Sequence, residues 1–427
     1  MLAHRLIDKA LKTAQGAQAT VQRAESTKVS FENDKLKFVK STQRTTINVK
    51  VVVNGKIGSS HTSDECDADG VVARALEAAA FGSPAHFEFP GPSDGRPVRV
   101  YDEAVLGVTR EAMVQIGREM MTVVKDYNPD ILVSAGINKG VRQTEFANSS
   151  GAAYQTQSTS FGVGVHGQWV RGTDILLAGH AFGWKKRDVD YGAIADRAVA
   201  LFRMAQDTAS IETGTFPVIF SPEALEVLVL ALRLGFNGKS VFLGASPLAE
   251  KLGQKIADAR FSLTDDPLID YASRSSRWDA EGVPRQVTPL IENGVVKNFL
   301  YDLDTAGRAG TRTTGHGVGC SPTNLVVKTG DTSWQDMVAD TKTGLVVYDV
   351  LGLGQGNPIS GEFSVNLQLA YKIEDGRIVG RVKDVMLAGN TYDALNNIVA
   401  VGDQAEWAGD SLLAPPIQIS DLNVVAR

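Results

Sequence analysis

The segment VTPLIENGVVKNFLYD, residues 287–302, has two apolar runs on either side of Asn293-Gly294. Asn-Gly favours a two-residue hairpin turn, because both residues tolerate the positive φ angles that such a turn requires. A second segment, LQLAYKIEDGRIVGRVKDVMLAG at residues 367–389, repeats this pattern around Asp375-Gly376. The two hairpins predict that the C-terminal half of the chain is rich in antiparallel strands.

One helix is expected within this β-rich half. In TGTFPVIFSPEALEVLVLALRLGFNG, residues 213–238, a strand over Phe216–Phe220 is followed by an almost wholly apolar stretch. Ser221 fits the N-cap of a helix, Pro222 its first position and Gly235 its C-terminal stop. Residues 211–427 are therefore predicted to form a β-rich, barrel-like domain with a buried helix.

The preceding residues predict a different pattern, in which helices and strands alternate irregularly. A short amphipathic helix begins the chain, and polar–apolar alternation around Asn54-Gly55 then indicates an antiparallel meander. The expected helices are Asp67–Ala80, Glu103–Val124 and Tyr191–Thr208, and the further strands are Asp130–Gly136, Gly140–Ala147 and Thr159–His166. Residues 1–210 are predicted to form an α+β domain with an antiparallel or mixed sheet.

Composition limits the classes of function. The net charge of −6 argues against a protein that binds nucleic acid, since such proteins usually carry a basic surface. No apolar run approaches the length of roughly 20 residues that spans a bilayer, so no membrane association is expected. With two cysteines and no secretory signal, the protein is expected to be cytoplasmic.

The reactive side chains give no self-contained catalytic motif. No two of the six histidines have the spacing of a helical zinc motif. His316 and Cys320 lie four residues apart in a glycine-rich loop and could form a nucleophilic pair, but no orienting acid is visible near them in sequence. A buried, structural cysteine is the simpler interpretation. The acids of Asp265-Asp266 and of Asp279 with Glu281 are expected to lie in exposed loops.

Several segments together resemble one protein family. The block D-A-E-G-V-P at residues 279–284, the L-I-E-N-G-V hairpin, the F-L-Y-D strand at 299–302 and the loop Thr314-Gly315 occur in the order typical of the TldD/PmbA family, once described as modulators of DNA gyrase. The segments TGTFPVIFSP, NSSG at 148–151 and ISGEFSVNLQLAYKIEDGRIVG at 359–380 extend the resemblance over nearly the whole chain.

The resemblance implies where a zinc site belongs and that this chain lacks it. Zinc-bearing TldD members have a helical H-E-x-x-x-H motif and a cysteine near the C-terminus. In this chain the two histidine positions fall on Leu225 and Leu230 and the glutamate position on Glu226, while residues 402–411 contain no cysteine. Leucine offers no lone pair to a metal, so we expect a degenerate, metal-free pseudo-active site.

A PmbA/TldE-like subunit of a zinc metalloprotease that acts on unfolded or small peptides is therefore expected. The resemblance implies a TldD-like partner, which would supply zinc, in a heterodimer, although a homodimer is also possible. This chain would shape the chamber and bind peptide, with backbone contacts in three loops. The candidate peptide-binding residues are Asn148, Ser149, Gly151, Gly315, Gly317, Gly319, Asn357 and Gly361.

Two other functions stay open at the level of sequence. The chain could be a homodimeric enzyme that uses His316 and Cys320. It could instead be a regulatory binding protein without catalytic activity, because its acidic charge does not argue against contact with proteins.

Overall fold

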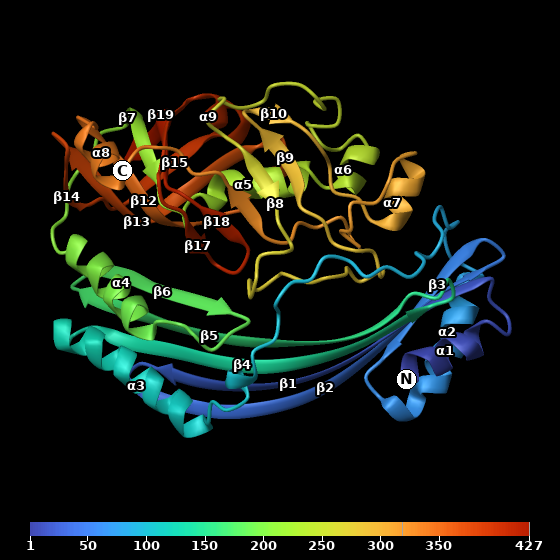
Figure 1. The fold of residues 1–427 in the computed structure, drawn as a ribbon. Coiled ribbons are helices and arrows are strands. Elements are labelled where there is room, and N and C mark those ends of the chain that lie inside the picture. Colours follow the sequence, from blue (N-terminus) through green and yellow to red (C-terminus); the bar gives the residue numbers. More distant parts are fainter. Residues whose placement is uncertain (318, 427) are drawn as a thin grey trace.

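The computed structural model describes residues 1–317 and 319–426, and its α+β fold confirms the predicted class. A long six-stranded antiparallel sheet forms one layer, and it curves around a second, β-rich part that follows it in the chain (Figure 1). The sheet has the order β3-β2-β1-β4-β5-β6. Its strands are β1 (Gly16–Glu32), β2 (Lys35–Val53), β3 (Lys56–Thr62), β4 (Leu132–Asn148), β5 (Ala153–Arg171) and β6 (Asp174–Trp184).

Four helices cover the two ends of this sheet. They are α1 (Leu2–Ala10), α2 (Ala68–Ala79), α3 (Arg110–Tyr127) and α4 (Tyr191–Met204). The helices α1 and α2 bury small and branched apolar side chains against β1 and β2, whereas α3 and α4 pack at the other end (Figure 1). The helix predicted over Glu103–Val124 begins only at Arg110 in the structure. The side chain of Thr109 accepts from the amide of Ala112 and so caps the start of α3 there. Only a 3₁₀ turn occupies Glu103–Val105.

The predicted strand boundaries in this sheet need correction. Asp130–Gly136 and Gly140–Ala147 are parts of one strand, β4, because β1 and β5 pair with it continuously through both glycines. The strand β6 was missed, since its sequence DILLAGHAFGW has small residues where an alternating pattern would show large ones. The order and antiparallel pairing of the strands come from these long-range contacts.

The second part of the chain contains two further sheets. In one of them, β12 pairs with both β7 and β13, so that β12, β7, β19, β15 and β13 form a closed ring, and this confirms the barrel-like character. Its strands are β7 (Gly214–Phe220), β12 (Thr343–Leu351), β13 (Glu362–Glu374), β14 (Arg377–Arg381), β15 (Val385–Asn390), β16 (Ile398–Val401) and β19 (Ile417–Ala426). The other sheet comprises β8 (Leu263–Asp265), β9 (Thr288–Glu292), β10 (Val295–Val296), β11 (Leu325–Val327), β17 (Glu406–Ala408) and β18 (Leu412–Ala414).

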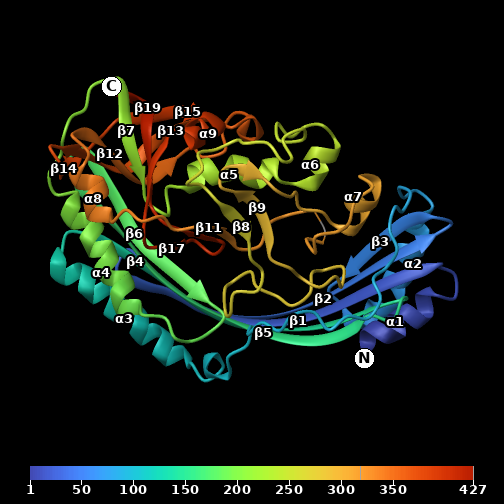
Figure 2. The same cartoon turned by 45° about the horizontal axis from the view of Figure 1, so that its top comes forward.

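The predicted buried helix is α5 (Glu226–Gly235), which lies among these strands (Figure 2). Ser221 caps the turn before it, because its hydroxyl accepts from the amide of Ala224. Gly235 is the last residue of the helix and does not follow it as predicted. The remaining helices are α6 (Gly238–Phe242), α7 (Leu303–Arg308), α8 (Trp334–Ala339) and α9 (Thr391–Asn396), with 3₁₀ turns at Glu65–Asp67 and Pro358–Ser360.

The predicted hairpin turns are confirmed by their backbone angles. Asn54-Gly55, Asn293-Gly294 and Asp375-Gly376 all have positive φ at both residues, as two-residue turns of this kind require. These turns fix the register of β2 with β3, β9 with β10 and β13 with β14. Local sequence therefore determined these hairpins.

The first sheet and the barrel share one hydrophobic core. Side chains of β5 and α4 pack in the same cluster as Tyr348 of β12 and Leu369 and Tyr371 of β13. The hydroxyl of Tyr371 donates to the carbonyl of Leu201 at 2.8 Å, and Arg381 pairs with Asp174. The domain boundary at residues 210–211 stays a prediction.

Within the described residues, no helix combines the length and apolar character that crossing a membrane requires.

Candidate functional site

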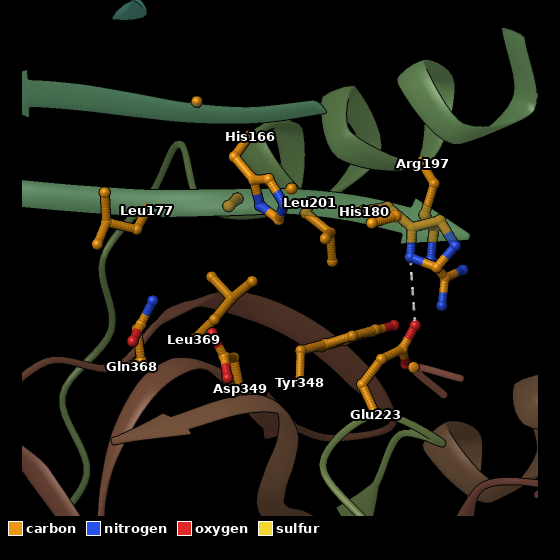
Figure 3. Close-up of a pocket in the computed structure, with 15 residues that line it drawn as sticks. His166, Leu177, His180, Arg197, Leu201, Glu223, Tyr348, Asp349, Gln368 and Leu369 are labelled. Atoms are coloured by element: carbon orange, nitrogen blue, oxygen red, sulfur yellow. Dashed lines mark ion pairs between the residues drawn. The ribbon is translucent and has the colours of Figure 1, made fainter. Parts of the chain in front are cut away.

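A cavity of about 380 Å³ lies where the first sheet meets the barrel (Figure 3). Its walls come from β5 and β6 on one side and from β12 and β13 on the other. The lining is completed by Arg197 and Leu201 of α4, by Glu223 just before α5 and by Gly409 after β17. The residues with polar side chains in this lining are His166, His180, Arg197, Glu223, Tyr348, Asp349 and Gln368.

The two histidines lie on neighbouring strands. His166 of β5 is opposite Gly179 of β6, and His180 is the next residue along β6. A Cβ at Gly179 would lie 2.3 Å from Nδ1 of His166, so only glycine leaves room for this ring. Nδ1 of His180 is 3.4 Å from Oε1 of Glu223, which joins the first sheet to the segment before α5 (Figure 3).

The guanidinium of Arg197, which lines the cavity, has two partners within the chain, the Tyr348 ring and Glu406. The guanidinium of Arg197, on α4, lies 5.6 Å from the centre of the Tyr348 ring, within the range of a cation–π contact. It also lies 3.5 Å from a carboxylate oxygen of Glu406. Arg197 is the only lysine or arginine among the lining residues. The cavity lining therefore has two carboxylates, Glu223 and Asp349, against one cation, which also pairs with Glu406.

Desolvation shifts the ionisation of the groups in this cavity. It lowers the pKa of His166, with Asp349 acting in the opposite direction, and it lowers the pKa of His180, with Glu223 opposing. It raises the pKa of Asp349 and raises that of Tyr348 to about 12. Both histidines are therefore disposed to be neutral at pH 7, which leaves their ring nitrogens able to accept a hydrogen bond.

The expected zinc positions do not fit a metal. Leu225 is fully buried in the core of the barrel, and Leu230 packs under Gly354. The carboxylate of Glu226 forms a bidentate pair with Arg233, at 3.0 and 3.2 Å. Among the described residues, no three His, Cys, Asp or Glu side chains converge as metal ligands would. These two leucines and the paired Glu226 therefore offer zinc no set of ligands at the motif positions.

The two segments that the zinc motif would occupy nevertheless meet in space. Arg233 of α5 also donates to the hydroxyl of Ser411, at the end of the cysteine-free segment 402–411. The cavity touches both regions, through Glu223 before α5 and Gly409 in that segment. The cavity therefore lies beside the degenerate motif.

His316 is held in the interior by a partner that sequence proximity did not reveal. Its Nε2 lies 2.7 Å from Oδ2 of Asp265, which is 51 residues away, and its Nδ1 lies 2.9 Å from the hydroxyl of Thr314. No orienting acid is visible near this histidine in sequence, but the fold brings Asp265 of β8 against the glycine-rich loop. Both ring nitrogens are thus occupied within the protein.

Cys320 contacts the backbone near α7 and belongs to the hydrophobic core. It is fully buried, and its sulfur accepts from the amide of Asp302 at 3.2 Å. Burial raises the pKa of its thiol, which opposes formation of the thiolate. These surroundings are those of a structural cysteine.

The backbone of the glycine-rich loop is hydrogen-bonded to two carboxylates and one guanidinium of this chain. The amide of Gly317 donates to Asp279 at 2.7 Å, that of Gly319 donates to Asp302 at 3.0 Å, and the carbonyl of Gly315 accepts from Arg285. The backbone groups of the loop that would contact a peptide are therefore largely used within the chain.

The prediction that the acids near this loop are exposed is wrong for three of them. Asp265, Asp279 and Glu281 are all at most 3% exposed. Glu281 accepts from Lys50 of β2 at 3.0 Å and from the amide of Leu303 at 2.9 Å. These carboxylates are buried because they accept backbone and lysine hydrogen bonds that the sequence does not reveal.

The Asn148–Gly151 turn is also engaged internally. The side chain of Asn148 accepts from the amides of Ser150 and Ala152, and Ser149 accepts from the amide of Ala17. Gly151 lies beside Pro92, at the rim of a second hollow that Tyr154 and Trp278 also line. Since Tyr154 contacts the carbonyl of Asp279, this turn and the Gly315–Gly319 loop lie around the same 277–285 block.

The third predicted loop lies over α5. Asn357 is exposed, and Gly361 has φ 88° with Tyr392 directly beside it. Gly352, Gly354 and Leu230 line the same small hollow as Gly361. The fold thus brings the Asn357–Gly361 loop to the degenerate zinc motif, whereas the Asn148–Gly151 and Gly315–Gly319 candidates lie together elsewhere.

No sequence motif indicated the residues that line the large cavity. His166, His180, Arg197, Glu223 and Asp349 come from five elements or loops and share no motif. One local signal was present, because each histidine has a glycine beside it in a strand, in VHG and in GHA. Glycine in a strand interior often marks a close approach of other groups.

Comparisons with known proteins show the family and the fold of this chain. Residues 213–426 match the family model described as the PmbA/TldA metallopeptidase C-terminal domain, and residues 17–80 match the model of PmbA/TldA metallopeptidase domain 1. An uncharacterized protein of Methanocaldococcus jannaschii is 28% identical over 384 residues, which is 87% of each chain. A metalloprotease PmbA homolog of Haemophilus influenzae is 23% identical over 97% of this chain and 94% of its own length. The crystal structure of TldE from Thermococcus kodakarensis has the same fold, with a TM-score of 0.93, 22% identity and complete coverage of both chains.

Proposed function

Since this chain belongs to the PmbA/TldD family of metallopeptidases, we propose that it is the metal-free subunit of a heteromeric zinc protease. One observation carries the proposal: the two positions for zinc-binding histidines hold Leu225 and Leu230. Leu225 packs in the barrel core and Leu230 beside Gly354, so both leucines serve packing in place of metal binding.

A TldD-like subunit is the partner that we propose. It would provide the zinc ion, which supplies an activated water and polarises the peptide carbonyl. The names of the relatives support a role in proteolysis, and the likeness to TldE supports the fold of the non-metal subunit. We expect the complex in the cytoplasm, because Cys66 and Cys320 are both free thiols.

The substrate that we propose is an unfolded or small peptide. Extended peptides bind proteins through main-chain hydrogen bonds, which tolerate many sequences. The large cavity and the Asn357–Gly361 loop, of which Asn357 is exposed, flank α5 and are our candidates for peptide contact. The Gly315–Gly319 loop and the Asn148–Gly151 turn are weaker candidates, because carboxylates and neighbouring side chains already occupy many of their backbone groups.

The test is reconstitution with a TldD-like zinc subunit. We expect cleavage of an unstructured peptide by the mixture, no cleavage by this chain alone, and loss of cleavage on addition of a chelator. A mixture whose zinc subunit carries a glutamine at its motif glutamate is the matched control. Zinc bound in a one-to-one ratio to the isolated chain would contradict the proposal, and so would chelator-resistant cleavage that depends on Cys320.

Neither alternative function has a specific observation in its favour. A catalytic pair of His316 and Cys320 would need a free imidazole nitrogen and an accessible sulfur, and both groups are buried and hydrogen-bonded to other partners. A purely regulatory role would appear in the reconstitution as stable association without cleavage.

A further inference from the structure

The cavity between the first sheet and the barrel contains a buried carboxylate oxygen that no donor among the described residues of this chain reaches. Oε2 of Glu223 is buried and has no hydrogen-bond partner, although Oε1 of the same carboxylate faces His180. A desolvated carboxylate oxygen without a donor is costly, so a donor from a ligand would be favourable there. Asp349 adds a second carboxylate to the same wall.

The lining residues favour an ammonium group over a metal ion as the cation that binds in the cavity. Arg197 does not compensate the two acids fully, since Glu406 and the Tyr348 ring already engage it. A metal ion is a poor fit, because no three ligating side chains converge within residues 1–317 and 319–426. An ammonium group makes lesser demands, because it is a point charge with donors that rotate to reach a carboxylate or a neutral imidazole.

The rest of the cavity suits an apolar group next to that ammonium. Leu177, Leu201 and Leu369 line it, and Leu177 is 41% exposed (Figure 3). The volume of about 380 Å³ lies within the range of pockets that hold small ligands. His166 and Asp349 are exposed, so the cavity is open to a ligand from solution.

We propose that this cavity binds the amino-terminal residue of a peptide, with its ammonium group at Glu223 and Asp349 and its apolar side chain among the three leucines. The inference rests on the proposed function for its choice of ligand, since a peptide substrate is what brings an amino terminus to this chain. In this proposal the subunit holds the amino-terminal end of a peptide, and the zinc subunit cleaves the peptide elsewhere.

Calorimetric titration of the isolated full chain tests the inference without any partner. The probe is the tripeptide leucine-glycine-glycine, compared with its N-acetylated form. We expect binding of the free peptide to be at least about tenfold tighter, because the charge-assisted hydrogen bonds are lost on acetylation. Equal binding of the two forms, or no binding of the free peptide at millimolar concentration, would overturn the inference.

Variants locate the site. Glu223→Gln and Asp349→Asn should each weaken binding of the free tripeptide by roughly tenfold or more, and leave the acetylated form unchanged. Glu250→Gln, at an exposed glutamate that is not among the lining residues of the cavity, is the matched control and should have no effect. Unchanged affinity in both cavity variants would show that the amine binds elsewhere.

A third peptide separates an amino terminus from a lysine side chain. Acetylated leucine-glycine-lysine has an ammonium only on its side chain, and we expect it to bind no better than the acetylated control. Tight binding of this peptide would overturn the assignment to amino termini. Failure of the reconstituted protease would leave these titrations unaffected, so the two proposals fail in different experiments.

Discussion

His316 and Asp265 form a fully buried pair, in which Nε2 of the imidazole lies 2.7 Å from Oδ2 of the carboxylate and neither side chain is exposed. The hydroxyl of Thr323 also donates to this carboxylate, so the pair joins β8, the glycine-rich loop and the segment that leads into β11. The His316–Asp265 pair therefore gives the glycine-rich loop a structural role. The histidine that was a catalytic candidate in the sequence fixes the position of the loop.

Removal of this histidine should destabilise the chain strongly. His316→Ala removes one hydrogen-bond partner of the buried Asp265 and leaves Thr323 as its remaining side-chain partner, and losing such a buried partner costs about 1–3 kcal/mol. Urea unfolding should show the loss as a lower midpoint. The control is His86→Ala, at an exposed histidine, and equal midpoints for the two variants would contradict the structural role.

Gly317 should tolerate no side chain. A Cβ there would lie 2.7 Å from Oδ2 of Asp279 and 2.8 Å from Cγ of Glu281, two side chains that are themselves buried. We expect Gly317→Ala to lower the free energy of unfolding by about 1–3 kcal/mol through overpacking. Gly91→Ala, where nothing lies within 4 Å of the new methyl group, is the control for thermal unfolding. A melting temperature equal to that of the control would show that the loop can move aside.

The two cysteines should differ sharply in reactivity. Cys66 is exposed, whereas Cys320 is buried and its thiol has a raised pKa. Ellman's reagent should therefore modify one thiol in the native chain and both in denaturant. In Cys66→Ser the native protein should show no fast reaction, and rapid labelling of that variant would revive the nucleophile hypothesis for Cys320.

Glu226 should be dispensable for peptide cleavage even though it occupies the motif glutamate position. Its carboxylate is paired with Arg233 and has no metal ligand beside it. In the reconstituted complex we therefore expect Glu226→Gln to keep kcat/KM within about twofold. A twofold change corresponds to about 0.4 kcal/mol in the activation free energy. A loss of a hundredfold or more, at unchanged assembly, would place this glutamate in the chemistry.

Stability should fall as the pH falls through the ordinary range of histidine. Desolvation lowers the pKa of His180 in the folded chain, so the unfolded chain binds more protons between the two pKa values. The contribution is fully present above the unfolded pKa of about 6.5 and is lost as the pH drops, with a slope of at most about 1.4 kcal/mol per pH unit. Melting temperatures measured from pH 7.5 to 5 should show this decline.

His180→Gln should make that profile less steep, because one group that must gain a proton is gone, while His166, whose pKa desolvation also lowers, remains. His4→Gln, at an exposed residue, serves as the control and should leave the slope unchanged. An identical decline in His180→Gln and the unaltered chain would assign the pH dependence to other groups.

The local sequence decided the elements whose signals are short in range. Asn54-Gly55, Asn293-Gly294 and Asp375-Gly376 fixed three hairpins, because positive φ at both turn residues is a property of the dipeptides themselves. The apolar stretch between Ser221 and Gly235 likewise predicted a buried helix, although the helix proper starts at Glu226. The absence of histidine from that helix is also a fact of sequence.

Only the tertiary structure decided which distant groups meet. Asp265 reaches His316 across 51 residues, and Glu281 reaches Lys50 across 231. The cavity brings His180 of β6 to Glu223 before α5, which no periodicity or spacing encodes. The sequence by itself determined the family and the degenerate motif. The fold determined the cavity beside that motif, because hydrogen bonding and burial depend on the packing of whole sheets against each other.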